Sequence, residues 1–437
     1  MSGMSEVVVG GARPLRGRLR VPGDKSISHR ALLFAALTDG RSTITGLATG
    51  ADVASTRRSL EQLGLRIKGS AEQLTITSNG VAGFREPEGV IDCGNSGTTM
   101  RVLSGVLAGR AFLSVLDGDA SLRRRPMARV VEPLRAMGAT IDARADGTLA
   151  PLVVRGGSLT GRRHVPSVAS AQVKSALVMA GLQSSGETEI VEPIASRDHT
   201  ERMLAALGAP VTTAADGTVR VTAGAPEAFE LAVPGDPSSA AFFVVAACIT
   251  AGSEIVLENI ALNPSRIAFI DVLRRMGADI EIEERELRIG EPVGDITVRA
   301  AALHGTTIAG DEMPSVQDEI PVLAVAAAFA EGVTDIRDAA ELRVKESDRI
   351  GTVHQELGQL GIAVESRPDG LLIRGGRPQS ALLKSHGDHR IAMAAAVAGH
   401  AIEGGDSTVR GWSAVDVSYP DFLADLAHLC EGPRDDG

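Results

Sequence analysis

The segment Leu60-Glu61-Gln62-Leu63-Gly64-Leu65-Arg66-Ile67 contains Leu, two residues, Leu or Met, Gly, and then a β-branched residue three positions on. Four more copies occur, at Leu134–Ile141, Leu204–Val211, Leu273–Ile280 and Leu357–Val364. Their glycines follow one another at intervals of 74, 70, 69 and 84 residues. The pattern is typical of an amphipathic helix that ends at a left-handed glycine and is followed by a strand. Five copies at similar spacing indicate an internal repeat.

A second kind of helix alternates with the first. These segments are rich in Ala and apolar nearly all round, so we expect them to be buried. They begin near Ser26, Ser96, Ala171, Ser238, Asp318 and Asp388. Together the two patterns predict six repeats of about 70 residues, the last one truncated.

The two halves of the chain also resemble each other. Val21-Pro22-Gly23-Asp24 recurs as Val233-Pro234-Gly235-Asp236, but only the first copy is followed by basic residues. We interpret both as the same junction in two pseudo-symmetric α/β domains of three repeats each. The predicted domains are residues 1–21 plus 235–437 and an inserted domain of residues 22–234. The loops before the buried helices are expected to face the gap between the domains, which would hold the active site.

Composition narrows the classes of function. The 437 residues carry a formal net charge of −11 and include one Trp and one Tyr, which argues against a base-stacking or general polyanion-binding surface. The three cysteines have no metal-site spacing, which fits a reducing cytoplasm. The long apolar runs contain polar breaks, so we expect no membrane span. We expect neither nucleic-acid nor membrane partners, and a monomer.

Several predicted helix starts carry groups that could bind anions. Lys25, Ser26 and Arg30 open the first buried helix, where free backbone N–H groups and the helix dipole favour an anion. Gly97 lies in the hydroxyl-rich stretch 92–101, for which a capped helix start is an equally simple explanation. Arg125 precedes Pro126, which we place at a helix start, whereas Arg123 and Arg124 are assigned to solvent.

Other polar groups on these helices leave two interpretations open. Ser170, Gln172 and Lys174 on an apolar helix need partners, either a ligand or neighbouring protein groups. Asp318 could be an N-cap or a general base.

Residues 341–349 form the densest charge cluster of the chain. If they are helical, Lys345 and Arg349 share one side, which favours an anion between them. Glu346 beside Lys345 offers an acid and a base. His386 and His389 lie three residues apart, but the stretch lacks the acidic or Cys partner spacing of a metal site, so we predict no metal.

The chain resembles the 5-enolpyruvylshikimate-3-phosphate synthase family, also called 3-phosphoshikimate 1-carboxyvinyltransferases, from Val21 to about Phe422. Six motifs carry the resemblance: GDKSISHR (23–30), GNSGTTMR (94–101), RRPM (124–127), SAQVKSA (170–176), RVKESDR (343–349) and GDHRIAM (387–393). The family fold has two domains of three βαβαββ units. The family transfers the enolpyruvyl group of phosphoenolpyruvate to the 5-hydroxyl of shikimate 3-phosphate through a tetrahedral intermediate. It uses no metal or organic cofactor.

The resemblance implies a role for each matching residue. Asp318 resembles the proton acceptor at the 5-hydroxyl, and Glu346 the group that protonates the methylene carbon; Lys25 is the third predicted catalytic residue. The expected shikimate 3-phosphate residues are Lys25, Ser26, Arg30, Ser170, Ala171, Gln172, Asp318 and Lys345. The expected phosphoenolpyruvate residues are Lys25, Gly97, Arg125, Gln172, Arg349 and Arg390.

Two departures and two rival functions accompany the resemblance. Many members carry a Lys shortly before the final Pro-x-Phe, but the stretch 415–422 has none. The motifs GDKSIS, SAQVK and RDHTE (197–201) resemble a subclass with glyphosate-insensitive members. Insensitive members can carry Ala where this chain has Gly97, so we predict inhibition by glyphosate.

The first rival function is that of the enolpyruvyl transferase that acts on UDP-N-acetylglucosamine, whose loop cysteine is absent from Asp117–Pro126. The second is that of a non-catalytic phospho-ligand binding protein.

Overall fold

The computed structural model describes residues 5–432. The chain forms two compact units. Unit 1 consists of Met1–Pro22, Pro234–Glu286 and Pro292–Gly437, and unit 2 of Gly23–Val233 and Leu287–Glu291. Both main boundaries therefore fall inside the two Val-Pro-Gly-Asp stretches. The short segment Leu287–Glu291 is the tip of a hairpin whose strands lie in unit 1.

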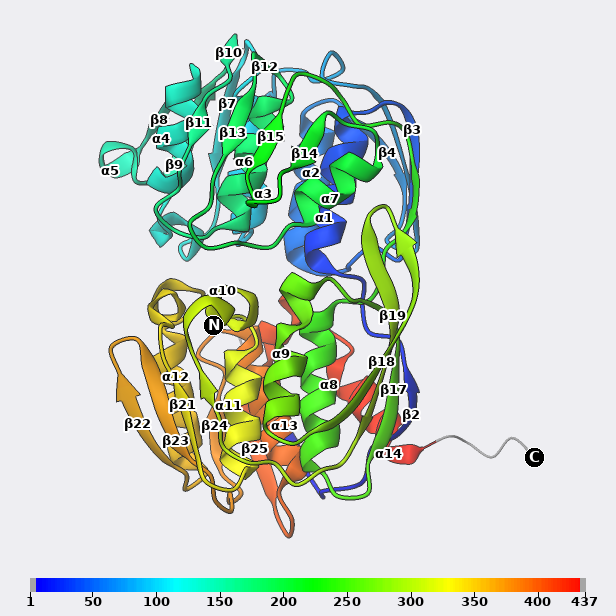
Figure 1. Cartoon of the computed structure of the whole chain (residues 1–437), viewed down its shortest axis with the longest axis vertical. Coiled ribbons are helices and arrows are strands. Elements are labelled where there is room, and N and C mark those ends of the chain that lie inside the picture. Colours follow the sequence, from blue (N-terminus) through cyan, green and yellow to red (C-terminus); the bar gives the residue numbers. More distant parts are fainter. Residues whose placement is uncertain (1–4, 433–437) are drawn as a thin grey trace, which may run out of the picture. The chain divides into compact units, whose positions relative to one another are not determined.

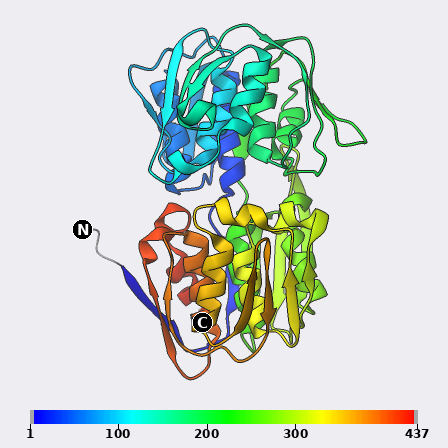
Figure 2. The ribbon, with the colours of Figure 1, turned by 90° about the vertical axis from the view of Figure 1, so that its left-hand side faces the viewer.

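Unit 2 places small-residue helices inside and sheets outside (Figures 1 and 2). The described part has three buried helices, α1 (Lys25–Leu37), α3 (Gly97–Leu107) and α6 (Ala171–Gly181). The helices between them are α2 (Ala51–Gln62), α4 (Ala128–Met137), α5 (Arg144–Gly147) and α7 (His199–Ala206). Gly105 shows why small residues are needed, because a Cβ there would lie 2.1 Å from the carbonyl oxygen of Ala176 on α6.

Each four-stranded sheet of unit 2 combines one parallel and two antiparallel pairings. The first has the order β16 (Glu230–Ala232), β3 (Asp39–Thr45), β5 (Gln73–Asn79), β4 (Arg66–Gly69). The second has the order β6 (Ile91–Asp92), β7 (Leu113–Asp117), β9 (Leu149–Arg155), β8 (Thr140–Ala143). The third has the order β11 (Arg163–His164), β13 (Thr188–Ile190), β15 (Val219–Val221), β14 (Val211–Thr213), and β10 (Leu159–Thr160) pairs with β12 (Ser184–Ser185). The first sheet is closed by a strand from the far end of the inserted segment, which brings the ends of that segment together.

Unit 1 repeats the plan with its own elements. Its buried helices, in the described residues, are α8 (Pro237–Ile249), α11 (Ile320–Phe329) and α13 (His389–Ala401), which pack on one another. The others are α9 (Pro264–Arg275), α10 (Met313–Val316), α12 (Arg349–Gln359) and α14 (Phe422–Glu431). Its sheets have the orders β18 (Asp279–Arg288), β19 (Glu291–Arg299), β17 (Glu254–Ala261), β2 (Arg16–Leu19), and β20 (Thr307–Ile308), β21 (Val333–Ile336), β23 (Gly370–Arg374), β22 (Ala363–Arg367). The third sheet has three strands, β1 (Glu6–Gly10), β25 (Asp406–Arg410) and β24 (Leu382–Lys384), as a truncated last repeat predicts.

The predicted helix ends are confirmed. Gly64, Gly138, Gly208, Gly277 and Gly361 all have positive φ, between 74° and 116°. They follow α2, α4, α7, α9 and α12, respectively. A residue with a side chain is strained in this conformation, so glycine ends each helix and turns the chain toward the next strand.

Unit 2 buries a histidine whose titration should make its stability depend on pH. His29 on α1 is fully buried, its Nδ1 lies 2.7 Å from Thr56 Oγ1, and its Nε2 has no hydrogen-bond partner among residues 5–432. Burial lowers the pKa of His29 from 6.5 to about 3; Lys25 and Arg30 act in the same direction, whereas Asp52 opposes them. His29 therefore binds a proton near pH 6 in the unfolded chain but stays neutral in the folded chain at that pH.

We expect this histidine to stabilise the fold fully above pH 6.5 and progressively less as the pH falls toward 3. The free energy of unfolding should drop by about 1.4 kcal/mol per pH unit below pH 6 from this group. Urea unfolding between pH 7.5 and 5 measures the slope, which should be smaller in His29→Asn. His304→Asn, at an exposed histidine, is the control and should leave the slope unchanged. Equal slopes in His29→Asn and the native chain would contradict the assignment.

Candidate active site

In unit 2 the predicted cations of α1 are held by neighbouring polar groups. Asp24 caps the helix by accepting from the Ile27 N–H at 2.7 Å. Lys25 Nζ lies 3.2 Å from Asp52 Oδ2. Arg30 is 4% exposed and donates to Thr200 Oγ1 (2.7 Å) and Ser175 Oγ (2.9 Å). It also donates to the carbonyl oxygen of Ser26, so both predicted residues are joined at the helix start.

The starts of α3 and α6 are linked by the side chain of Gln172. Arg101 Nη1 donates to Gln172 Oε1 at 2.5 Å, and Gln172 Nε2 donates to Thr98 Oγ1 at 3.0 Å. Arg125 Nη2 donates to Asn95 Oδ1 at 2.5 Å, which places its guanidinium at the same helix start. These bonds bring the predicted residues Gln172 and Arg125 to the α3 start, where Gly97 lies.

Gly97 leaves room for these guanidinium groups. A Cβ at this position would lie 2.8 Å from Arg101 Nη1 and 3.3 Å from Arg125 Nη1. Ser96, the residue before it, caps α3 through its side chain, which accepts from the Thr99 N–H at 3.1 Å. The capping explanation is therefore correct for Ser96, and it is compatible with cations gathered beside the helix start.

The remaining predictions in unit 2 are resolved individually. Ser170 caps α6, and Ala171 is the first residue of that helix. Lys174 is 3% exposed and pairs with Glu192 and Glu201 at 2.8 and 2.7 Å, so its partners are protein carboxylates. Arg123 forms an exposed ion pair with Asp117. Our placement of Pro126 at a helix start was wrong, because α4 begins at Ala128; Arg125 does have the extended backbone that a following proline favours.

In unit 1 three carboxylates surround Arg349. Its guanidinium is 1% exposed and donates to Asp388 Oδ2 (2.8 Å), Glu346 Oε2 (2.6 Å) and Asp318 Oδ1 (3.4 Å). Burial alone would lower the pKa of Arg349, but these carboxylates raise it above the ordinary value. Burial likewise opposes ionisation of Asp388, and Arg349 reverses that effect, so the pKa of Asp388 is lowered. The predicted base and acid are thus both ionic partners of one buried arginine.

The segment before Arg349 differs from our expectation. A 3₁₀ turn spans Ala340–Val344, Lys345 is extended, and α12 begins at Arg349. The expected helical pairing of Lys345 with Arg349 is therefore wrong. An anion does lie between the two cations, because Asp318 Oδ1 is 3.4 Å from Lys345 Nζ and from Arg349 Nη1. Asp318 is not the cap of α11, since Glu319 holds that position.

Arg390 completes the predicted set in unit 1. Its Nη1 donates to the Asp318 carbonyl oxygen at 2.9 Å and lies 3.3 Å from Glu319 Oε1. Asp388 caps α13 by accepting from the Arg390 N–H, and the same carboxylate holds Arg349. One aspartate therefore connects two predicted phosphoenolpyruvate residues.

Three residues that serve this arrangement were missed by the sequence analysis. Arg101 and Asp388 lie inside motifs that we quoted, whereas Asp52 lies outside all six. Their partners are 71 residues (Gln172), 39 residues (Arg349) and 27 residues (Lys25) away along the chain. Position in a helix-start motif was the available signal for the first two; for Asp52 we find none.

Within residues 5–432, no group of three or more His, Cys, Asp or Glu side chains is arranged to hold a metal ion. His386 Nε2 instead lies 2.6 Å from Glu356 Oε1. No helix in that part of the chain is both long and apolar enough to cross a bilayer.

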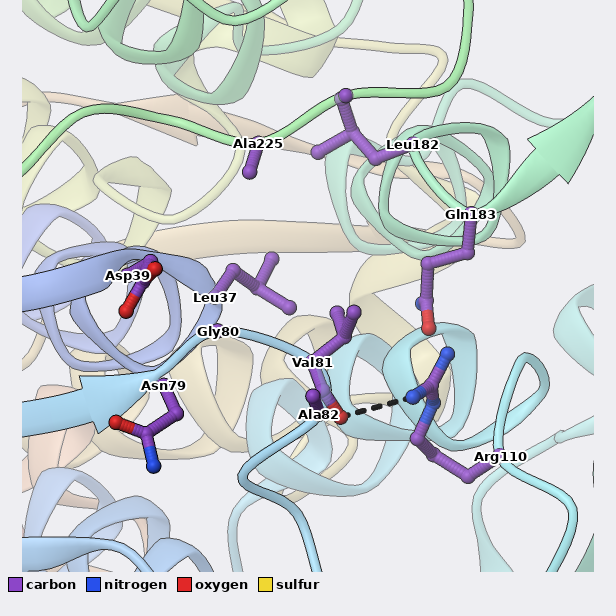
Figure 3. Close-up of a pocket in the computed structure, with 11 residues that line it drawn as sticks. Leu37, Asp39, Asn79, Gly80, Val81, Ala82, Arg110, Leu182, Gln183 and Ala225 are labelled. Atoms are coloured by element: carbon purple, nitrogen blue, oxygen red, sulfur yellow. Dashed lines mark hydrogen bonds between the residues drawn. The ribbon is translucent and has the colours of Figure 1, made fainter.

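A cavity of about 320 Å³ lies at the C-terminal ends of α1 and α6 in unit 2 (Figure 3). Leu37 ends α1, and Leu182 and Gln183 follow α6. Arg110 lines the cavity and donates to the Val81 carbonyl oxygen at 2.8 Å. The predicted substrate-binding residues of unit 2 lie at or before the N-terminal ends of α1, α3 and α6. This cavity is therefore not the candidate site.

Comparisons with known proteins identify the family of the chain. The model of the family described as EPSP synthase (3-phosphoshikimate 1-carboxyvinyltransferase) matches residues 9–426. The chain belongs to the EPSP synthase family. A 3-phosphoshikimate 1-carboxyvinyltransferase of Synechococcus sp. is 53% identical over 96% of this chain and 95% of its own length. One from Herpetosiphon aurantiacus is 51% identical over 96% of this chain and 98% of its own.

Solved structures give the same answer for the fold. The EPSP synthase of Acinetobacter baumannii has a TM-score of 0.88, with 40% identity and 98% of both chains covered. The enolpyruvyl transferase NikO of Streptomyces tendae has a TM-score of 0.78 at 18% identity, covering 98% of both chains, which shows a shared fold alone. The α/β enolpyruvyl transferase fold, which the resemblance implied and with which the repeat count agreed, is confirmed.

Proposed function

We propose that this member of the EPSP synthase family transfers the enolpyruvyl group of phosphoenolpyruvate to the 5-hydroxyl of shikimate 3-phosphate, releasing phosphate, in the shikimate pathway of aromatic amino-acid biosynthesis. The observation that carries the proposal is the family match over residues 9–426, in which all six motifs are present. The clustering of Asp318 and Glu346 on Arg349 supports an active enzyme, because a protein that only binds anions does not need two carboxylates there.

We assign substrate binding to the cationic helix starts. Shikimate 3-phosphate would be held by Lys25, Ser26, Arg30, Ser170, Ala171, Gln172, Asp318 and Lys345, and phosphoenolpyruvate by Lys25, Gly97, Arg125, Gln172, Arg349 and Arg390. Fixed guanidinium and ammonium groups stabilise the charge that develops during the reaction without having to reorganise. Three carboxylates accept from the guanidinium of Arg349, so a substrate anion would have to compete with them for its N–H groups.

The chemistry assigned to this chain's residues is proton transfer. Asp318 accepts the proton of the 5-hydroxyl while the hydroxyl oxygen forms a bond to C2 of phosphoenolpyruvate. Glu346 gives a proton to the methylene carbon, producing a tetrahedral ketal phosphate. Glu346, left ionised by that step, then takes a proton back from the new methyl group; the double bond forms again as the C–O bond to phosphate breaks and inorganic phosphate leaves. Both carboxylates need a group that holds them in place, and Arg349 contacts both.

The test is phosphate release by the purified chain. Phosphoenolpyruvate would be offered with shikimate 3-phosphate or with UDP-N-acetylglucosamine, both in the presence of EDTA. We expect release with shikimate 3-phosphate only. Release only with the sugar nucleotide would move the function to the other enolpyruvyl transferase, and release with neither would leave a binding protein.

A single methyl group added at position 97 should weaken both glyphosate inhibition and phosphoenolpyruvate binding. We expect the native chain to be inhibited by glyphosate at low phosphoenolpyruvate, and Gly97→Ala to raise both the inhibitory concentration and the KM for phosphoenolpyruvate. The new Cβ would press on the ends of Arg101 and Arg125, which are flexible enough to move. Steady-state kinetics checks this, with Gly157→Ala as control because nothing lies within 4 Å of a Cβ there. Unchanged turnover of the native chain in millimolar glyphosate would refute the prediction.

We further propose that the chain acts in the cytoplasm as a monomer. Its three cysteines are unpaired, which fits a reducing compartment. Size-exclusion chromatography with light scattering measures the oligomeric state, and a mass of twice 45.3 kDa would contradict the monomer.

A further inference from the structure

The second Val-Pro-Gly-Asp stretch has no basic residues after it, yet its polar groups are engaged. Asp236 caps α8 by accepting from the Ser238 N–H at 2.8 Å. The same carboxylate forms a buried ion pair with Arg266 of α9, at 2.8 Å, and Arg266 also donates to Ser238 Oγ at 2.9 Å. The N-terminal end of α8, which lacks predicted substrate-binding cations, is therefore held by a network of Asp236, Ser238 and Arg266.

This network continues to the N-terminal end of α11. Ser238 Oγ donates to Glu319 Oε1 at 2.5 Å. Glu319 is 1% exposed, and the same Oε1 lies 3.3 Å from Arg390 Nη1. Arg390 is also bonded to the carbonyl oxygen of Asp318, the residue before Glu319. A single carboxylate oxygen thus connects the α8 start with a predicted phosphoenolpyruvate residue.

We propose that Glu319 is a positioning residue that fixes the guanidinium of Arg390 for the phosphoenolpyruvate anion, with Ser238 as the group that anchors it. The inference rests on the proposed function, because it needs Arg390 to bind that substrate. An arginine side chain has many rotamers, and anchoring it beforehand removes an entropy cost from binding. The buried carboxylate of Glu319 would be unfavourable without a cation, so Glu319 depends on Arg390 as Arg390 depends on Glu319.

Positioning and simple electrostatics predict opposite effects, which makes the proposal testable. Glu319→Gln keeps the shape and an oxygen acceptor but removes the negative charge beside Arg390. If only charge mattered, the more positive site would bind the substrate anion more tightly. If Glu319 fixes Arg390, binding weakens. We expect KM for phosphoenolpyruvate to rise about tenfold, in line with the loss of a charged hydrogen bond, and KM for shikimate 3-phosphate to stay within twofold.

A second variant tests the anchor without altering charge. Ser238→Ala keeps the Glu319 side chain and removes its hydrogen bond from Ser238, so KM for phosphoenolpyruvate should rise about threefold. In an Arg390→Ala background, Glu319→Gln should add less than twofold, because the residue that it positions is gone. Glu312→Gln is the matched control, since Glu312 pairs with Arg275 outside the network.

The experiment is steady-state kinetics of the full chain, with thermal unfolding to confirm that each variant is folded. A lower or unchanged KM for phosphoenolpyruvate in Glu319→Gln would overturn the inference. So would equal increases in the KM of both substrates, or a full effect of Glu319→Gln in the Arg390→Ala background. Absence of turnover in the native chain would instead overturn the proposed function, and this inference with it.

Discussion

Asp318→Asn should lower kcat by about 10²- to 10⁴-fold, the usual effect of removing a general base. Asparagine retains an oxygen that can accept from Lys345 and Arg349, so the site should keep its geometry. It cannot take the hydroxyl proton. Because the change also removes a negative charge beside two cations, KM for phosphoenolpyruvate should not rise. Steady-state kinetics measures kcat and KM for phosphoenolpyruvate, and calorimetric binding of shikimate 3-phosphate checks that the site still binds its other substrate.

Asp335→Asn is the matched control for this variant. Asp335 pairs with Arg337 and Arg367, as Asp318 pairs with two cations, but it lies in a sheet strand and outside the predicted site. Its kcat should stay within twofold of the native value. Full binding with undiminished turnover in Asp318→Asn would withdraw the role of Asp318 as base.

Glu346→Gln should also reduce kcat by about 10²- to 10⁴-fold, but through the carbon proton. During turnover in D₂O, the native chain should introduce deuterium at C3 of the enolpyruvyl group, because protonation creates a methyl group that later loses one hydrogen. In Glu346→Gln the rate of deuterium appearance should fall in parallel with kcat. The amide oxygen can still accept from Arg349, so folding and substrate binding should be retained.

Glu365→Gln provides the comparison for Glu346. Glu365 is exposed and pairs with Arg367, at 3.2 Å, without belonging to the site. Deuterium incorporation at the native rate in Glu346→Gln would assign protonation of the carbon to another group.

Features of the fold with local causes could be predicted from the sequence. A glycine that ends a helix needs only its own left-handed backbone, and Gly64 and its four counterparts adopt it. Ser96 likewise satisfies an N–H three residues away. Each such signal can be read within a few residues, and five repeats confirm one another.

Features with distant causes could not be predicted. Residues 343–349 contain good helix formers, yet Arg343 donates to the carbonyl oxygens of Arg367 and Pro368, and Arg349 donates to Asp388. These partners, from the β22–β23 turn and the α13 start, hold the segment in a bent path. The bend brings both Lys345 Nζ and Arg349 Nη1 to 3.4 Å from Asp318 Oδ1, a pairing that helical spacing does not predict. Arg101 was missed for the same reason, because its partner Gln172 lies on another helix.

The pairing of β1 with β25 has a consequence for the order in which the chain matures. Glu6 and Arg410 are partners 404 residues apart, so the strand that leaves the ribosome early is completed late. At about 5–20 residues per second, β1 waits roughly 20 to 80 s for its partner strand. The sheets of unit 2 need no strand beyond Ala232 and can form during that interval. The inserted segment can therefore fold during translation, whereas the third sheet of unit 1 stays incomplete until β25, the last strand among residues 5–432, has been made.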